Sequence, residues 1–416
     1  MKKFLVLGAS YDEVDVVKMA QSLGYYVIVT DFYDTWEDNP AKYIADKVWH
    51  ISWSDTDTLA QKCREEGVVG VLGGFSEFRV ESMIDLCEKL GLPCYINREQ
   101  LEVTRDKNLF KKMCVRYGVP IVKEYAPEAD NIVFPVIIKP TDRGGSIGIN
   151  VAYDAKEYKT YLEYAYSMSP SKSVVVEDFI GDGVKFDCSY AIVEGEPILI
   201  ETCDTTMLSK KKGYETLQKA WTFPSCHEQE YLEKVDGSVK AMLKNMGMKY
   251  GVANISFFYR NGDFYVFETG FRLGGGHSFD YQRMTGGIDY LEMLINYASG
   301  ETVATNKEII KDRGVAVTYN IYLEAKVGET LEVLEGEDDV RKMPGLATFV
   351  KYMYNGQVWN NEKPRKILMC TICASNVSEL STKVDYINSH LRVKTPNGVY
   401  PILGELTKEE INVFLK

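Results

Sequence analysis

Two lysines and a glycine-rich turn stand where a polyanion could be bound. Lys107 lies at a predicted helix start, and Lys139 ends an apolar strand over residues 134–140. A lysine among apolar strand residues is costly to bury unless an anion pairs with it. Residues 143–148 (RGGSIG) follow directly, and glycine lets backbone N–H groups approach phosphate oxygens closely. These features together predict a site for a nucleoside triphosphate.

An acidic residue and a basic residue farther along the chain fit the same chemistry. Glu268 stands at a strand end, four residues before Arg272. A carboxylate is a hard oxygen ligand for magnesium, and a guanidinium stabilises the charge of a transferring phosphate. Residues 174–180 (VVVEDFI) end a strand whose backbone edge and apolar faces suit an adenine ring.

Each of these features has a structural alternative when it is taken alone. Lys107 is typical of a solvated helix residue, and a glycine loop is usually a hairpin. Glu177 is typical of a surface strand, while Glu268 and Arg272 could form a structural ion pair. The order in which the features follow one another is more specific than any one of them.

The elements that must position these residues fall into three predicted domains. Residues 1–104 alternate strands and helices, which is typical of a doubly wound α/β layout. Its four predicted strands cover residues 4–7, 26–30, 68–72 and 93–96. Residues 105–300 begin with a predicted helix over 105–117 and are then dominated by strands, and residues 301–416 read as a smaller α+β domain with a helix near 379–391.

Composition narrows the function classes. The chain has 416 residues with 48 basic and 60 acidic side chains, a net charge of −12, which argues against nucleic acid or an anionic membrane as the main partner. No apolar run approaches the roughly 18–20 residues of a membrane span. Nine scattered cysteines fit reduced thiols, so we expect a cytoplasmic protein.

Three other features could indicate a dehydrogenase site, a redox or zinc site and a proton-transfer residue, but another interpretation of each is preferred. The turn at Gly8 follows a strand but lacks the other glycines of a dinucleotide fingerprint, so a tight turn is preferred to a dehydrogenase site. Cys370 and Cys373 have redox or zinc half-site spacing, yet their apolar flank predicts a buried strand. His277 follows three glycines, and we favour a pocket-lining role over proton transfer.

In this order of motifs the chain resembles the ATP-grasp superfamily, and most closely its carbamoyl-phosphate synthetase large-chain-like and biotin-carboxylase-like branch. The resemblance implies an N-terminal doubly wound α/β domain, a two-lobed ATP-grasp domain and a small C-terminal α+β domain. It also implies ATP with Mg²⁺, or Mn²⁺ as the alternative ion. A carboxylate would be phosphorylated to an acylphosphate, and an amine or another nucleophile would then displace phosphate.

The resemblance carries over residue by residue. It assigns ATP phosphates to Lys107 and Lys139, the covering loop to Gly144, Gly145 and Ser146, adenine to Glu177, Asp178, Phe179 and Ile180, the metal to Glu268 and, more weakly, Ser256, and catalysis to Arg272 and Lys139.

The chain departs from the family pattern at several positions. Ser256 stands where a glutamate or glutamine usually binds metal, and serine offers only a neutral, shorter oxygen. Gly270 and Phe271 replace the usual asparagine and proline, and Lys185 stands near where an acidic or glutamine residue often meets the ribose. These changes keep a second function open beside the ligase, namely a catalytically weakened nucleotide-binding protein.

The strand register offers a structural test of the resemblance. A two-residue turn at Asn261 and Gly262 predicts Ile255 opposite Glu268, whereas a loop over 261–263 predicts Ser256 there. The resemblance requires Ser256 opposite Glu268. The expected partners are a small-molecule carboxylate and an amine or other nucleophile, and a homo-oligomer is left open.

Overall fold

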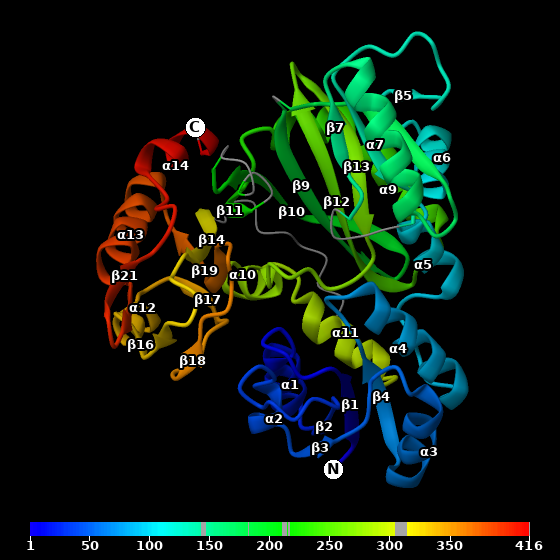
Figure 1. The fold of residues 1–416 in the computed structure, drawn as a ribbon. Helices are drawn as coiled ribbons and strands as arrows, with labels where there is room; N and C mark the ends of the chain where they lie inside the picture. The colour runs from blue at the N-terminus through cyan, green and yellow to red at the C-terminus, as the bar shows by residue number, and fades with distance from the viewer. Residues whose placement is uncertain (143–146, 182, 210–213, 215–216, 304–313, 416) are drawn as a thin grey trace.

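The computed structural model describes residues 1–142, 147–181, 183–209, 214, 217–303 and 314–415. The predicted loop residues Gly144, Gly145 and Ser146 lie outside these ranges. Figure 1 shows the N-terminal region at the bottom, a long sheet above it and the C-terminal region on the left. Within the described part of the chain, no helix is long and apolar enough to cross a membrane.

The N-terminal region is a parallel sheet with strand order β3-β2-β1-β4. Its apolar strands are buried on both faces, as helices on either side require. The strands are β1 (Lys3–Leu7), β2 (Tyr26–Thr30), β3 (Lys47–Trp49) and β4 (Val68–Leu72), and the helices are α1 (Glu13–Ser22), α2 (Ala41–Ile44), α3 (Thr56–Glu66) and α4 (Glu77–Leu90). The order reverses at β1, so the carboxyl ends of β1 and β4 form the switch point of a doubly wound sheet.

The fourth strand of this region differs from the sequence prediction, and the turn at Gly8 agrees with it. The fourth strand is β3, not residues 93–96, because that buried segment leads into Asn97, which caps the next helix through a reciprocal pair with Gln100. The turn at Gly8 is a tight one: its φ is +98°, and a Cβ there would lie 2.9 Å from the Arg79 guanidinium.

The predicted helix over 105–117 is confirmed over residues 107–117, and a second helix that was not predicted from the sequence ends just before it at Arg105. The two helices are α5 (Arg98–Arg105) and α6 (Lys107–Tyr117). The Asp106 carboxylate accepts hydrogen bonds from the N–H groups of Asn108 at 2.8 Å and Leu109 at 3.1 Å. This cap makes Lys107 the first residue of α6.

A small lobe follows, with strand order β5-β8-β6-β7 and its own apolar core. Its elements are β5 (Glu124–Tyr125), β6 (Val136–Pro140), β7 (Asn150–Ala152), α7 (Ala155–Met168) and β8 (Val174–Asp178). Lys139 pairs with Val175 in the ladder between β6 and β8, and Ile137 pairs with Glu177.

An eight-stranded sheet dominates the rest, in the order β13-β12-β9-β10-β11-β14-β19-β17. Its strands are β9 (Val184–Val193), β10 (Glu196–Met207), β11 (Gln218–Phe223), β12 (Tyr250–Arg260), β13 (Asp263–Gly270), β14 (Val315–Leu323), β17 (Leu346–Lys351) and β19 (Arg365–Ala374). Because β11 pairs with β14, this sheet continues across residue 300, where the sequence places a domain boundary. The three-domain division itself stays a prediction.

Helices join the large sheet to its neighbours. They are α8 (Glu228–Lys234), α9 (Asp236–Asn245), α10 (Ser278–Met284) and α11 (Tyr290–Ala298). Helix α11 contacts both β4 and β12, and one apolar core runs from β1 to β12 (Figure 1). The N-terminal sheet and the near half of the large sheet therefore share a core.

The C-terminal region closes the far half of the large sheet with a separate core. Its further elements are β15 (Thr330–Leu331), β16 (Val333–Glu335), α12 (Glu337–Arg341), β18 (Gln357–Val358), α13 (Val377–His390), β20 (Arg392–Thr395), β21 (Gly398–Pro401) and α14 (Lys408–Phe414). Cys370 and Cys373 lie on β19, a strand as predicted, and Cys370 is buried.

Candidate functional site

Three lysines gather where α6 meets the small lobe. Lys139 Nζ lies 2.6 Å from Glu177 Oε2, and Lys111 pairs with the other Glu177 oxygen and with Glu124. Lys107 Nζ is 3.4 Å from the Thr141 carbonyl oxygen. The Glu177 side chain is only 2% exposed, so it balances two ammonium groups away from water. We did not identify Lys111 from the sequence, although its position four residues after Lys107 on one helix face was a usable signal.

Burial outweighs the carboxylates that surround the lysines of this cluster. Burial lowers the pKa of Lys139 to about 7, and the neighbouring charges of Lys111 and Lys107 act in the same direction. Burial also lowers the pKa values of Lys107 and Lys111. Lys107 adds a cation at a helix N-terminus, where the backbone dipole already favours anions. The cluster would therefore gain from a bound anion of high charge.

The β12–β13 hairpin places Ser256 opposite Glu268, but by a route that neither sequence alternative contained. Its turn has two residues, because Arg260 pairs with Asp263. Asn261 and Gly262 have φ values of +53° and +86°, as a type I′ turn requires. A β-bulge then shifts the register by one residue beyond Ser256, so that Ser256 pairs with Glu268.

Glu268 and Arg272 belong to the same charged group as the lysines. Glu268 acts to raise the pKa values of both Lys107 and Lys139, which places its carboxylate within electrostatic reach of each. Burial raises the pKa of Glu77, whereas Arg272 and Arg105 oppose that rise. Glu77 on α4, which was not predicted, acts on Lys107 and is itself influenced by Arg272 and Glu268, so it connects the predicted residues electrostatically.

The hydrogen-bond donors of Arg272 are available to a ligand. Within the described residues, no ion pair joins it to Glu268, so the structural ion-pair alternative does not hold. Its Nε is buried with no hydrogen-bond partner there, and Nη1 makes only a 3.5 Å contact with the Leu273 carbonyl oxygen. A buried donor without an acceptor is costly, and an anionic ligand would supply the acceptor.

The predicted adenine segment 177–180 is partly occupied by the chain. The Glu177 side chain is held by lysines, and the N–H groups of Asp178 and Phe179 donate to the carbonyl oxygens of Lys123 and Pro135, each at 3.0 Å. Among the described residues, no partner is found for the N–H of Ile180, whose side chain is buried. Ile180 is therefore the N–H of this segment that a purine could use.

His277 lies in a different cluster and does not line a pocket. It is wholly buried, with Nδ1 2.7 Å from Asp15 Oδ2 and Nε2 3.0 Å from Asp12 Oδ1. Burial acts to lower its pKa, but the hydrogen bonds to the two carboxylates raise the pKa to about 9. A charged histidine held by two aspartates ties the loop before α10 to the start of α1. The sequence interpretation of a pocket-lining residue is corrected accordingly.

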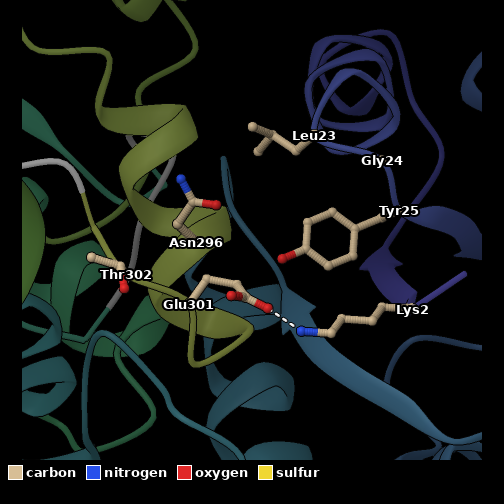
Figure 2. Close-up of a pocket in the computed structure, with 7 residues that line it drawn as sticks. All are labelled: Lys2, Leu23, Gly24, Tyr25, Asn296, Glu301 and Thr302. Atoms are coloured by element: carbon tan, nitrogen blue, oxygen red, sulfur yellow. Dashed lines mark hydrogen bonds and ion pairs between the residues drawn. The ribbon is translucent and has the colours of Figure 1, made fainter.

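A pocket of about 460 Å³ lies apart from these groups, between the residues that precede β1 and β2 and the end of α11 (Figure 2). Its charged lining is one exposed ion pair between Lys2 and Glu301. It includes none of the clustered lysines or arginines, so the chemistry of the charged group does not depend on it.

Comparison with known proteins gives relatives for both the sequence and the fold. A family model described as D-ala D-ala ligase C-terminus matches residues 110–272. The C-terminal section of the carbamoyl phosphate synthase large chain of Aquifex aeolicus is 24% identical over 299 residues, covering 64% of this chain and 53% of that protein. The whole carbamoyl phosphate synthase large chain of Clostridium beijerinckii is 23% identical over 298 residues, covering 64% of this chain and 26% of that protein. The chain thus matches about half or less of the length of these relatives.

Solved structures resemble the chain over nearly its full length. The biotin carboxylase domain of Hydrogenobacter thermophilus 2-oxoglutarate carboxylase, a dimer in complex with MgADP, ADP and bicarbonate, gives a TM-score of 0.79 at 18% identity, covering 96% of this chain and 91% of that one. The L-amino acid ligase of Bacillus licheniformis gives 0.72 at 18% identity, covering 95% and 98%. At these identities the likeness concerns the fold.

Proposed function

We propose that this chain, a member of the ATP-grasp superfamily on its carbamoyl phosphate synthase and biotin carboxylase branch, is an ATP-dependent carboxylate–amine ligase. The observation that carries the proposal is the lysine cluster, whose pKa values are lowered by burial, beside Glu268 and Arg272. Its substrates are proposed to be a small-molecule carboxylate and an amine or other nucleophile. The dimer of the Hydrogenobacter domain suggests a homo-oligomer as a further proposal.

The lysines and Arg272 would act in the first of the two steps of the reaction. Lys107 and Lys139 would neutralise the phosphates of ATP while the substrate carboxylate attacks the terminal phosphorus, which forms an acylphosphate and releases ADP. Arg272 would stabilise the charge on the phosphoryl group in transfer. The amine would then attack the acyl carbon, with phosphate as the leaving group. Gly144, Gly145 and Ser146 are proposed to cover the phosphates and exclude water from the anhydride.

The residues present fit a divalent cation. Glu268 is exposed and offers a carboxylate, and Ser256 offers a hydroxyl directly opposite it on the neighbouring strand. Hard oxygen donors are what Mg²⁺ and Mn²⁺ prefer. A bound Mg²⁺ would supply neutralisation of phosphate charge, and Glu268 with Ser256 would hold it. Glu177 to Ile180 remain the proposed adenine segment, with Ile180 as donor.

A nucleotide-binding protein without turnover is the second candidate, because Ser256 is a weaker metal ligand than the usual acidic residue. A screen of carboxylates and amines that reads ADP release decides between the two candidates. Release that depends on both substrates supports the ligase. Stabilisation of the protein by ATP with Mg²⁺ but no ADP release from any pair selects the second candidate, and the absence of any nucleotide effect contradicts both.

A further inference from the structure

A second acidic side chain extends the row formed by Glu268 and Ser256. In the large sheet Ser256 on β12 pairs with Glu268 on β13 on one side and with Asp187 on β9 on the other. Directly paired residues of antiparallel strands point to the same face of a sheet. The row across three neighbouring strands is therefore carboxylate, hydroxyl, carboxylate.

This face is the one that meets the lysine cluster rather than the core. The neighbours of the row along β9 and β12, Phe186, Cys188 and Phe257, are fully buried on the opposite face. Asp187 itself is 21% exposed. Asp187 therefore lies on the face from which Glu268 acts on Lys107 and Lys139.

The spacing of the row suits one small cation. Neighbouring strands are about 4.8 Å apart, so the backbones that carry the two carboxylates lie about 10 Å apart. Serine between them is short, which leaves space above it that a glutamate would fill. Two carboxylates that reach inwards from the flanking strands can share an ion there.

The surroundings of Asp187 orient its carboxylate and leave it acceptor capacity to spare. Ser256 donates its hydroxyl proton to Oδ1, while Thr205 donates to Oδ2 at 2.8 Å and Lys185 Nζ lies 3.6 Å from Oδ2. A carboxylate has about four lone-pair positions, and the two hydroxyl donors use two of them. These three contacts all come from donor groups, so they orient the carboxylate across the row.

We propose that Asp187 is a metal ligand of this chain and, together with Glu268, holds the divalent cation across Ser256. The ligand that the resemblance places on the middle strand, a glutamate or glutamine, is then replaced by a carboxylate from the adjacent strand. This inference rests on the proposed function, because the cation would accompany ATP. It also weighs against loss of catalysis, since the serine is compensated by a neighbouring carboxylate.

The test is a titration with Mn²⁺ followed by electron paramagnetic resonance, in which free Mn²⁺ gives the signal and bound Mn²⁺ does not. It is made on the full chain, alone and with a non-hydrolysable ATP analogue. Asp187→Asn should weaken Mn²⁺ binding at least about tenfold. Glu196→Gln, which removes the same charge from an exposed site on β10, should leave the affinity unchanged.

A compensating variant separates ligation from a purely structural role. Asp187→Asn combined with Ser256→Glu restores a carboxylate on the middle strand, and we expect Mn²⁺ affinity to return to within about threefold of the parent chain. Unchanged Mn²⁺ affinity in Asp187→Asn overturns the proposal, and so does a folded double variant that stays weak. A parent chain that binds Mn²⁺ through Asp187 but no ATP analogue would contradict the proposed function while it supports the site.

Discussion

Two clusters in this protein each combine a buried cation with carboxylates. They differ in the direction in which the pKa of the cation is shifted. At the lysine cluster, burial and mutual repulsion lower the pKa of Lys139 to about 7, although Glu177 lies 2.6 Å away. At the junction before α10, two aspartates raise the pKa of His277 to about 9 despite burial. At the first cluster burial outweighs the nearby carboxylates, whereas at the second the carboxylates outweigh burial.

The comparison distinguishes a cluster that can bind a ligand from a cluster that stabilises the fold. A buried cation whose pKa is lowered gains from an external anion, whereas one whose pKa is raised already has its partners. The lysine cluster adjoins Arg272, whose Nε has no acceptor among the described residues. Changes at the first cluster should therefore affect ligand binding and reaction, and changes at the second should affect stability.

The largest effect is expected for Arg272→Ala. We expect the rate of ADP release to fall about 10³-fold, because the charge of the transferring phosphoryl group loses its guanidinium partner. The free energy of unfolding should change by less than about 1 kcal/mol, since Arg272 makes little use of its donors within the described fold. Chemical denaturation beside the ADP assay measures both. A large loss of stability with unchanged ADP release would reverse the roles of the two clusters.

His277→Ala should show the converse pattern. We expect the variant to lose about 2–3 kcal/mol of unfolding free energy, because it lacks the buried imidazolium that contacts Asp12 and Asp15, whose side chains are 27% and 22% exposed. His50→Ala, at an exposed histidine paired with Asp34, is the matched control and should leave the denaturation midpoint unchanged. A stable His277→Ala protein without activity would place His277 in the reaction instead.

The pH dependence of stability tests whether His277 is charged in the folded protein. The pKa of His277 is raised to about 9 in the folded protein, so its contribution is complete below the unfolded value near 6.5. That contribution is lost as the pH rises through about 9. We expect the difference in unfolding free energy between the parent chain and His277→Ala to shrink over this range, by about 3 kcal/mol. A difference that stays constant from pH 6 to pH 10 would contradict the assigned charge.

Nucleotide binding should depend on pH in the way that a lowered lysine pKa dictates. Lys139 loses its proton above a pKa of about 7, and only the charged form attracts phosphate. We expect the affinity for a non-hydrolysable ATP analogue to fall about tenfold between pH 7 and pH 8.5. Lys139→Arg keeps its charge and should give a nearly flat profile over the same range, which controls for titration of the nucleotide. Equal slopes for both proteins would rule out Lys139 as the titrating group.

The smallest effect is expected for Lys111→Met. Lys111 lowers the pKa of Lys139, so its removal should move the midpoint of the pH profile upwards. The affinity for the ATP analogue at pH 7 should change only a few-fold, because Lys111 is held by Glu177 and Glu124. Calorimetric titrations at several pH values measure the shift. A downward shift would contradict the charge balance described for this cluster.

Much of the fold was predictable because its signals are local. Apolar runs such as residues 4–7 and 26–30 predict buried strands, and Asp106 before Lys107 predicts a helix start. β3 was missed because three residues, Lys47–Trp49, carry too little periodicity. Residues 93–96 were wrongly predicted as a strand, because apolar content alone does not show that a segment has a neighbouring strand to pair with.

The candidate site was predictable only where one residue carries the signal. Lys139 stands out in an apolar strand, but Lys111 and Asp187 act through partners that are distant in sequence, Glu177 and Ser256. The bulge that pairs Ser256 with Glu268 depends on how two strands fit together. Such long-range pairings are set by packing rather than by the residues nearby.

The central claim is that the lysine cluster binds the phosphates of ATP. Isothermal titration calorimetry of the full chain with a non-hydrolysable ATP analogue and Mg²⁺ tests it most directly, with Lys139→Ala as the comparison. We expect saturable binding by the parent chain and a loss of at least about tenfold in the variant, since charged partners of phosphate contribute strongly. No heat of binding in the parent chain, or equal affinity in both proteins, would contradict the account.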